Sequence, residues 1–119
     1  MTCDETDRLL VVRELIDFSR PVESIQKELA KFEWDYDSDC VQLKKSNLTS
    51  VLKRYLNSEL SALDIECWAN CIEGRDDICY DAGSEQIIEN LIYEFANPTL
   101  TQLLNSERAK TILDMIDSL

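Results

Sequence analysis

The sequence contains no histidine, only two glycines and two prolines, and half as many basic as acidic residues. Without histidine, the usual general base and the usual serine and cysteine triads are missing. So few glycines and prolines supply few tight turns, which disfavours an all-β architecture and favours helices. With a formal net charge of -12, the chain lacks the basic footprint that direct binding of DNA or RNA requires. Such a charge attracts basic partners, although many acidic proteins carry it only for solubility.

The first residues also lack the basic start of a signal peptide. The opening stretch MTCDETDRLL carries acidic residues where a signal peptide carries basic ones, and no apolar run reaches the length of a membrane span. We therefore expect a cytoplasmic protein that makes no membrane contact. The five cysteines are an odd number and follow no secretory signal, so we expect them to be reduced thiols.

Apolar residues make up 45% of the 119 residues and are spread along the chain, as in a compact domain. They recur at intervals of three and four, which is the spacing of buried helix faces. The sequence predicts an all-α fold, a compact orthogonal bundle of about six helices in one domain covering residues 1–119. The first helix is expected from Arg8 to Phe18, and Pro21 suits the first turn of the second. The apolar faces expected for the later helices are Val22, Ile25, Leu29 and Phe32; Leu48, Val51, Leu52, Tyr55 and Leu56; Ile65, Trp68, Ala69 and Ile72; Ile87, Ile88, Leu91, Ile92 and Phe95; and Ala109, Ile112, Leu113 and Ile116.

Polar and loop-forming residues mark the ends of these helices. Ser61 with Asp64 forms an imperfect capping box at the start of the fourth helix. Gly74 is expected to end that helix, and the pair Asn97-Pro98 to break the fifth. The serines expected to cap helices three to six are Ser46, Ser61, Ser84 and Ser106. The residues of the third helix expected to point away from the core are Lys53, Arg54 and Asn57.

Strand signals are few. Only two short segments, WDYDSDCVQL and DICYD, alternate with the period of a strand. We expect at most one short β-like pairing, between these two segments.

Three cysteines lie close together in the stretch ECWANCIEGRDDICYD. Cys67 and Cys71 share a helix face, but structural zinc needs four cysteine or histidine ligands, and the fourth would have to be Cys3 or Cys40. Thiols are among the most buried side chains and pack as small apolar groups. We therefore expect the cysteines, Cys79 included, to fill space in the core. We predict no metal and no cofactor, with a zinc module as the alternative.

The run DYDSD places Asp35, Asp37 and Asp39 at the first three ligand positions of a calcium-binding EF-hand loop. Such a loop also needs glycine at its sixth position and glutamate at its twelfth. These positions hold Cys40 and Ser46, so the sequence excludes an EF-hand of that form.

Carboxylates are the remaining candidates for catalysis. Asp76 with Asp77 or Glu73 could do acid–base work as a pair. Arg75 stands among them, and its simplest role is an ion pair that ties the loop after the fourth helix to the body. The two glycines form no phosphate-binding loop. We expect no enzymatic activity.

The segment EWDYDSD interleaves two aromatic residues with four acidic ones. In an extended conformation, Trp34 and Tyr36 point to one side and the acids to the other. Two interpretations of Trp34 stay open: it packs on the core, or it anchors an interface with a partner. Trp68 lies on the apolar face of the fourth helix and is expected in the core.

Two longer stretches, ALDIECWANCIEGRDDICYD and IIENLIYEFANPTLTQLL, resemble the small helical immunity proteins of bacterial contact-dependent growth inhibition systems. VQLKKSNLTSVLKRYLNSELS, just before them, fits the same family, so the resemblance covers roughly residues 41–119. The chain departs from the family pattern at Cys67, Cys71 and Cys79. The residues that match the pattern, most of them expected to be architectural, are Trp68, Ala69, Asn70, Glu73, Gly74, Arg75, Asp77, Ile78, Asn97 and Pro98.

The resemblance implies a non-catalytic cytoplasmic inhibitor that binds the cognate C-terminal toxin domain delivered by a neighbouring cell. Many such toxins are nucleases with basic clefts, which a carboxylate-rich surface can fill or cover. We predict no direct contact with nucleic acid or membrane, and the oligomeric state stays open. An acidic adaptor or regulatory subunit of an intracellular complex is the alternative. The residues expected to contact the toxin are Trp34, Asp35, Tyr36, Asp37 and Asp39, with a second patch of Asp76, Tyr80 and Asp81.

Overall fold

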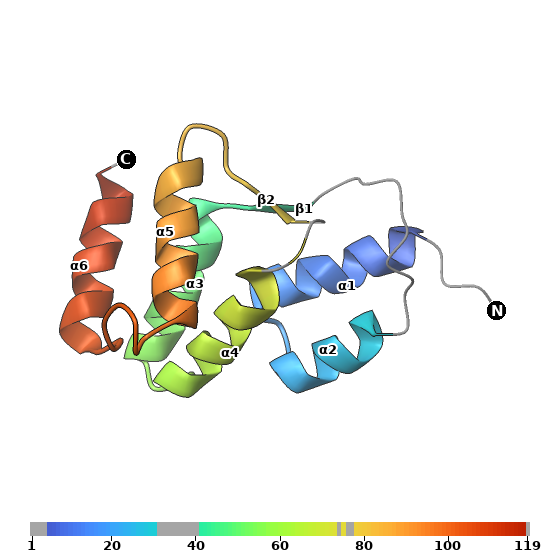
Figure 1. The fold of residues 1–119 in the computed structure, drawn as a ribbon, viewed down its shortest axis with the longest axis horizontal. Coiled ribbons are helices and arrows are strands. Elements are labelled where there is room, and N and C mark those ends of the chain that lie inside the picture. Colours follow the sequence, from blue (N-terminus) through green and yellow to red (C-terminus); the bar gives the residue numbers. More distant parts are fainter. Residues whose placement is uncertain (1–4, 31–40, 74, 76–77, 119) are drawn as a thin grey trace.

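The structure is a computed structural model that describes residues 5–30, 41–73, 75 and 78–118, with the side chains of residues 5–8 excepted. Within these ranges the chain forms six α-helices and two short strands (Figure 1). In chain order they are α1 (Glu5–Asp17), α2 (Val22–Leu29), β1 (Val41–Leu43), α3 (Lys45–Leu56), α4 (Ala62–Glu73), β2 (Ile78–Tyr80), α5 (Glu85–Ala96) and α6 (Ser106–Asp117). The expected helical bundle with one short strand pairing is confirmed. No helix in the described ranges combines the length and the apolar character that a membrane span needs.

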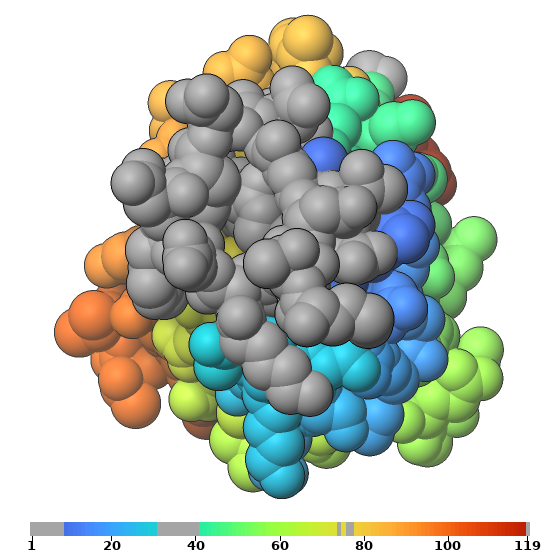
Figure 2. All heavy atoms as spheres, turned by 90° about the vertical axis from the view of Figure 1, so that its right-hand side faces the viewer, coloured from blue at the N-terminus to red at the C-terminus, as the bar shows by residue number. Residues whose placement is uncertain are grey.

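The helices form two groups that run in crossing directions (Figure 1). α3 packs against α6 in one group, and α1 packs against α2 in the other. α4 joins the groups, because it packs against both α5 and α2. Figure 2 looks onto the side of the molecule where α1, in blue, and α2, in cyan, reach the surface.

β1 and β2 form a parallel pair in which Val41 lies opposite Ile78 and Leu43 lies opposite Tyr80. The backbone N–H of Asp81 donates to the carbonyl of Leu43 at 3.1 Å and extends this pairing. Parallel strands need a long crossover connection, which α3 and α4 supply here. The pairing therefore fixes the position of β2 beside the helical core.

The apolar faces predicted from the sequence form that core. α1 begins at Glu5 rather than Arg8 and adds a buried face of its own. Tyr55, Leu56, Ile87 and Leu113 pack half-buried around the core. Phe32, expected on the second helix, lies outside the described residues. The largest fully buried side chains are Trp68, Leu15, Ile16, Ile25, Leu43, Leu48, Leu52, Ile65, Ile72, Ile88, Ile92 and Ile112.

The capping box at the start of α4 is confirmed. The N–H of Asp64 donates to the Ser61 hydroxyl at 3.0 Å, and the N–H of Ser61 donates to the Asp64 carboxylate at 2.8 Å. α4 ends at Glu73, directly before Gly74, which lies outside the described residues. Ser84 precedes α5 as predicted, but its side chain makes no cap hydrogen bond.

Two predicted serine caps are wrong. The N-cap of α6 is Asn105, whose side-chain oxygen accepts the N–H of Arg108 at 2.8 Å, so Ser106 is the first helical residue. The N-cap of α3 is Lys44, so Ser46 lies inside the helix, and the side-chain oxygen of Asn47 at the third helical position accepts the N–H of Lys44 at 2.8 Å. Asparagine satisfies the first N–H groups of a helix as well as serine does. When the two residues are adjacent, their types alone do not identify the cap.

Arg54 was expected to point away from the core and instead contacts it. Its guanidinium donates to the carbonyl of Phe18 at 2.7 Å and lies 5.3 Å from the centre of the Phe18 ring. Phe18 ends α1 in a left-handed conformation with φ of 50°, which turns its carbonyl and ring toward α3. The long arginine stem allows a residue on a polar face to reach such a partner. Lys53 and Asn57 are exposed, as predicted.

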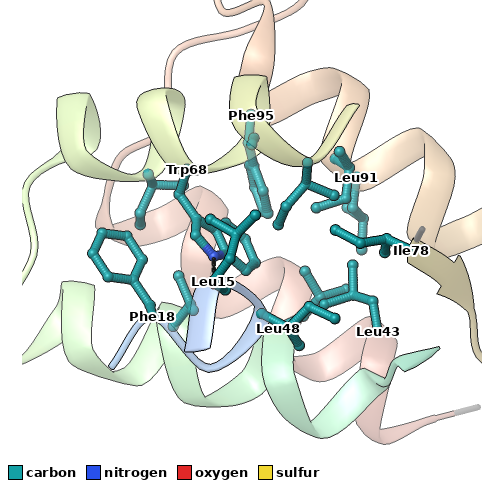
Figure 3. Packing of buried hydrophobic residues seen from close by; sticks show 14 of the residues in the cluster. Leu15, Phe18, Leu43, Leu48, Trp68, Ile78, Leu91 and Phe95 are labelled. Atoms are coloured by element: carbon teal, nitrogen blue, oxygen red, sulfur yellow. Dashed lines mark hydrogen bonds between the residues drawn. The ribbon is translucent and has the colours of Figure 1, made fainter. Parts of the chain in front are cut away.

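Trp68 occupies the place where α4 crosses the end of α1 (Figure 3). Its side chain is fully buried. The indole N–H donates to the carbonyl of Leu15 at 2.6 Å, and the ring stacks on Phe18 with centroids 6.1 Å apart. A buried indole needs such a partner for its polar N–H. Trp68 therefore joins the two helix groups through apolar contact and one specific hydrogen bond.

Arg108 on α6 holds Glu94 on α5 through two hydrogen bonds, of 2.7 and 2.9 Å. The side chains are only 22% and 12% exposed, and the bonds raise the pKa of Arg108. Replacing Arg108 by methionine would leave a largely buried carboxylate without its hydrogen-bond donor, so we expect the free energy of unfolding to fall by about 2 kcal/mol. Chemical denaturation measures this change.

A matched control is available at the other end of the molecule. Arg20 bonds to Glu14 and Glu28, whose side chains are far more exposed than Glu94. Arg20→Met should therefore cost less stability than Arg108→Met. An equal or larger loss from Arg20→Met would contradict the role given to the buried pair.

Candidate functional site

The structure describes part of the predicted toxin-contact surface. Tyr80 is the last residue of β2 and Asp81 follows it, and both side chains are half-buried. The other predicted contact residues lie outside the described residues, so their role stays a prediction: Trp34, Asp35, Tyr36, Asp37, Asp39 and Asp76.

Tyr80 lines a hollow of about 380 Å³ between the end of α4, β2 and the outer face of α5. Its walls contain two carboxylates, one guanidinium, two phenols and one amide. We call it the Tyr80 groove. Its lining residues are Glu73, Arg75, Ile78, Tyr80, Glu89, Asn90, Ile92 and Tyr93.

Helix periodicity explains why α5 supplies so much of this lining. Ile88 and Leu91 are buried, which leaves Glu89, Asn90 and Tyr93 on the outer side of the same helix. Glu89 and Tyr93 are four residues apart and so are neighbours on the helix surface. Sequence reasoning missed these residues as site candidates because it treated α5 only as a source of core residues.

The C-terminal ends of α4 and α5 meet beside this groove. The side-chain amide of Asn97 donates to the Glu73 carboxylate at 3.4 Å and to the carbonyl of Tyr93 at 3.0 Å. α5 ends at Ala96, so the predicted break at Asn97-Pro98 is confirmed. The C-terminal ends of α4 and α5 are therefore held together beside Tyr80.

The electrostatic environment of Tyr80 is negative. Burial raises the pKa of its hydroxyl above 10, and the charges of Glu89 and then Glu73 raise it further. The hydroxyl therefore remains protonated at neutral pH and can donate or accept a hydrogen bond. A cation entering the groove would meet these two carboxylates and two tyrosine side chains, with the Arg75 guanidinium in the same wall.

The pKa of Tyr80 provides a test of this arrangement. We expect Glu89→Gln to lower it toward 10 and Glu73→Gln to lower it less, because Glu89 makes the larger charge contribution. The pKa of Tyr80 is higher in the folded than in the unfolded protein. Its ionisation therefore leaves the free energy of unfolding unchanged below about pH 10 and lowers it as the pH rises further. Spectrophotometric titration of the phenolate measures the shift.

Comparison with Tyr80→Phe identifies the transition that belongs to Tyr80. A Tyr80 pKa at or below 10, or one unchanged by Glu89→Gln, would contradict the placement of these residues.

The other motif residues divide between core and surface. Trp68, Ala69 and Ile78 are buried. Asn70 is exposed and lines a different hollow, between α4 and α2. Arg75 is half-buried in the wall of the Tyr80 groove, and its ion pair with a neighbouring acid stays a prediction. Gly74, Asp76 and Asp77 lie outside the described residues.

The expectation of reduced cysteines is confirmed for Cys67 and Cys71 and wrong for Cys79, and the expectation that they fill the core is wrong for the exposed Cys67. Cys79 is disulfide-bonded, and its partner lies outside the described residues. Cys67 and Cys71 remain thiols; Cys67 is exposed, and only Cys71 packs against the core. Spacing along the chain does not tell which cysteines approach one another in space. In the part of the chain that the structure describes, no three acidic or cysteine side chains gather as metal ligands.

Reduction of the Cys79 disulfide should destabilise the fold. A disulfide restricts the unfolded chain, so we expect the free energy of unfolding to fall by about 2 kcal/mol when a reductant is added. Thermal unfolding with and without reductant measures the change. The unfolding temperature of Cys79→Ser should not change when the reductant is added. If the unfolding temperature of the wild-type protein did not change either, the disulfide would not be stabilising.

No family model, curated protein or solved structure matches the chain.

Proposed function

We propose that this protein is a non-catalytic immunity protein that acts in the cytoplasm. It binds the cognate C-terminal toxin domain delivered by contact-dependent growth inhibition and keeps that domain inactive. The observation that carries the proposal is the Tyr80 groove, where Glu73, Arg75 and Ile78 of the first resembling stretch line the same hollow as Glu89 and Tyr93 of the second.

The proposed partner is basic, and a toxin that cleaves nucleic acid fits this requirement. A nuclease holds phosphates with lysine and arginine, so its cleft attracts a chain with a net charge of -12. Opposite charge raises the rate of encounter, while buried contacts set the lifetime of the complex. The inhibitor fills the cleft or covers its entrance and contributes no chemistry of its own.

The Tyr80 groove suits an arginine or lysine side chain of such a partner. Glu89 and Glu73 supply carboxylate acceptors for a charge-assisted hydrogen bond. Tyr93, 48% exposed, offers a ring face on which a guanidinium can stack. Carboxylates together with an aromatic ring bind a cationic side chain more tightly than carboxylates alone, because the ring also contributes apolar contact.

Affinity purification of the full chain from its source cells, at low and at high salt, tests this function. We expect mass spectrometry to identify a basic nuclease-like domain, encoded beside this gene, that is released as salt increases. A complex with housekeeping proteins that survives high salt, with no toxin in it, would instead favour the acidic adaptor.

A further inference from the structure

A second surface, away from Glu73, is apolar. Leu63 lies in the first turn of α4, and Leu100 and Leu103 lie in the loop between α5 and α6. These leucines are 65%, 73% and 70% exposed, more than any other large apolar side chain described. Exposed apolar side chains that lie together are typical of binding surfaces.

Two of these leucines form walls of a hollow of about 260 Å³. Ile65 and Phe95, both buried, also line it. Most of the lining is apolar, and the charged side chains in it are both acidic. We call it the leucine groove. Its lining residues are Ala62, Leu63, Ile65, Glu66, Glu94, Phe95, Pro98, Gln102, Leu103 and Leu104.

The loop that carries Leu103 is held in place by hydrogen bonds. The Thr101 hydroxyl lies 2.9 Å from the carbonyl of Asn97 and 3.1 Å from that of Glu94. Farther along, the Tyr55 hydroxyl donates to the carbonyl of Leu104 at 3.4 Å. The leucines are thus presented on an ordered backbone, which lowers the entropy lost when a partner binds.

Charge indicates which kind of partner fits. Glu94 is bonded to Arg108, so its charge is largely offset, whereas Glu66 adds a half-buried carboxylate to the lining. A second copy of this chain would bring another net charge of -12 to the contact, which opposes self-association. A basic segment would meet a complementary surface.

We propose that the leucine groove is a docking site for a basic protein partner that inserts one apolar side chain flanked by lysine or arginine. The apolar side chain covers Leu63 and Leu103, and a flanking cation reaches Glu66. This inference goes beyond the proposed function, because the groove lies at the opposite end of α4 from Glu73 and would serve a toxin or any other basic partner.

The test uses three synthetic peptides: one with a single leucine between lysines, one with alanine in place of that leucine, and one with the leucine between glutamates. We expect the leucine peptide to shift the amide NMR signals of Leu63 and Leu103. The alanine peptide should bind about tenfold more weakly, because it buries less apolar area. A leucine peptide with glutamates in place of the lysines should not bind.

Leu103→Asn should abolish the difference in affinity between the leucine peptide and the alanine peptide. Leu100→Asn is the matched control, because Leu100 is equally exposed on the same loop but does not line the groove. Both positions are exposed, so both variants should keep the wild-type unfolding temperature.

Three results would overturn the inference: equal binding of the two lysine peptides, shifts that avoid Leu63 and Leu103, or dimerisation that involves these leucines in sedimentation experiments. None of them requires the toxin, so they would leave the proposed function standing. Conversely, failure to find a toxin partner would not alter the peptide result.

Discussion

Replacing Trp68 by alanine should lower the free energy of unfolding by about 4 kcal/mol, which removes much of the stability of a domain this small. Trp68 is fully buried, stacks on Phe18 and donates to the carbonyl of Leu15. Its removal would leave a cavity at the junction of α4 and α1. Equilibrium denaturation measures the loss, and we expect the variant to unfold at a markedly lower denaturant concentration.

Two further variants separate the causes of this loss. Trp68→Phe keeps most of the apolar volume but removes the bond to Leu15, so it should cost about 1 kcal/mol of hydrogen-bond energy together with a smaller packing loss. The Leu15 carbonyl would still accept the N–H of Phe18 at 3.0 Å. Tyr93→Ala, at a half-exposed position, should change stability little. If Trp68→Ala were as stable as Tyr93→Ala, Trp68 would not be the structural centre.

Reversing two charges in the Tyr80 groove, with Glu73→Lys and Glu89→Lys together, should weaken binding to the toxin domain by about a hundredfold or more. Under the proposed function, these carboxylates receive a cationic side chain of the partner. In the variant, that side chain would meet two ammonium groups instead. Surface plasmon resonance against the purified toxin domain measures the association and dissociation rates separately.

The matched control changes the net charge by the same amount on a different helix. Asp114 and Asp117 are exposed on α6, so Asp114→Lys with Asp117→Lys alters long-range attraction without touching the groove. We expect this control to slow association modestly and to leave dissociation unchanged. Equal losses in the two double variants would show that net charge, rather than the groove, governs binding.

The helices and the core were predictable from the sequence because apolar residues recur at intervals of three and four within each helical segment. The faces of α3, α4 and α5 are buried where the spacing predicts, and Trp68 lies among them. The pairing of β1 with β2 was also predictable, since few other segments alternate. The helix faces depend on residues near one another in the chain, whereas the strand pairing joins distant segments and was predictable only because so few segments could pair.

Features that depend on distant residues were not predictable. The sequence places Arg54 on a polar helix face, yet it reaches Phe18, the residue that follows α1. Nothing local indicates that Glu89 and Tyr93 of α5 would stand beside Tyr80 of β2. The disulfide of Cys79 is a contact of the same kind. The candidate site was therefore identified only in part from the sequence.

Under the proposed function, a toxin domain is encoded beside this gene, and growth of cells that produce that domain tests whether this protein confers immunity. Co-expression of this protein should restore growth to the wild-type rate, and the Glu73→Lys, Glu89→Lys variant should fail to restore it although it remains folded. Cells that stop growing in the presence of the wild-type protein as quickly as in its absence would contradict the immunity function.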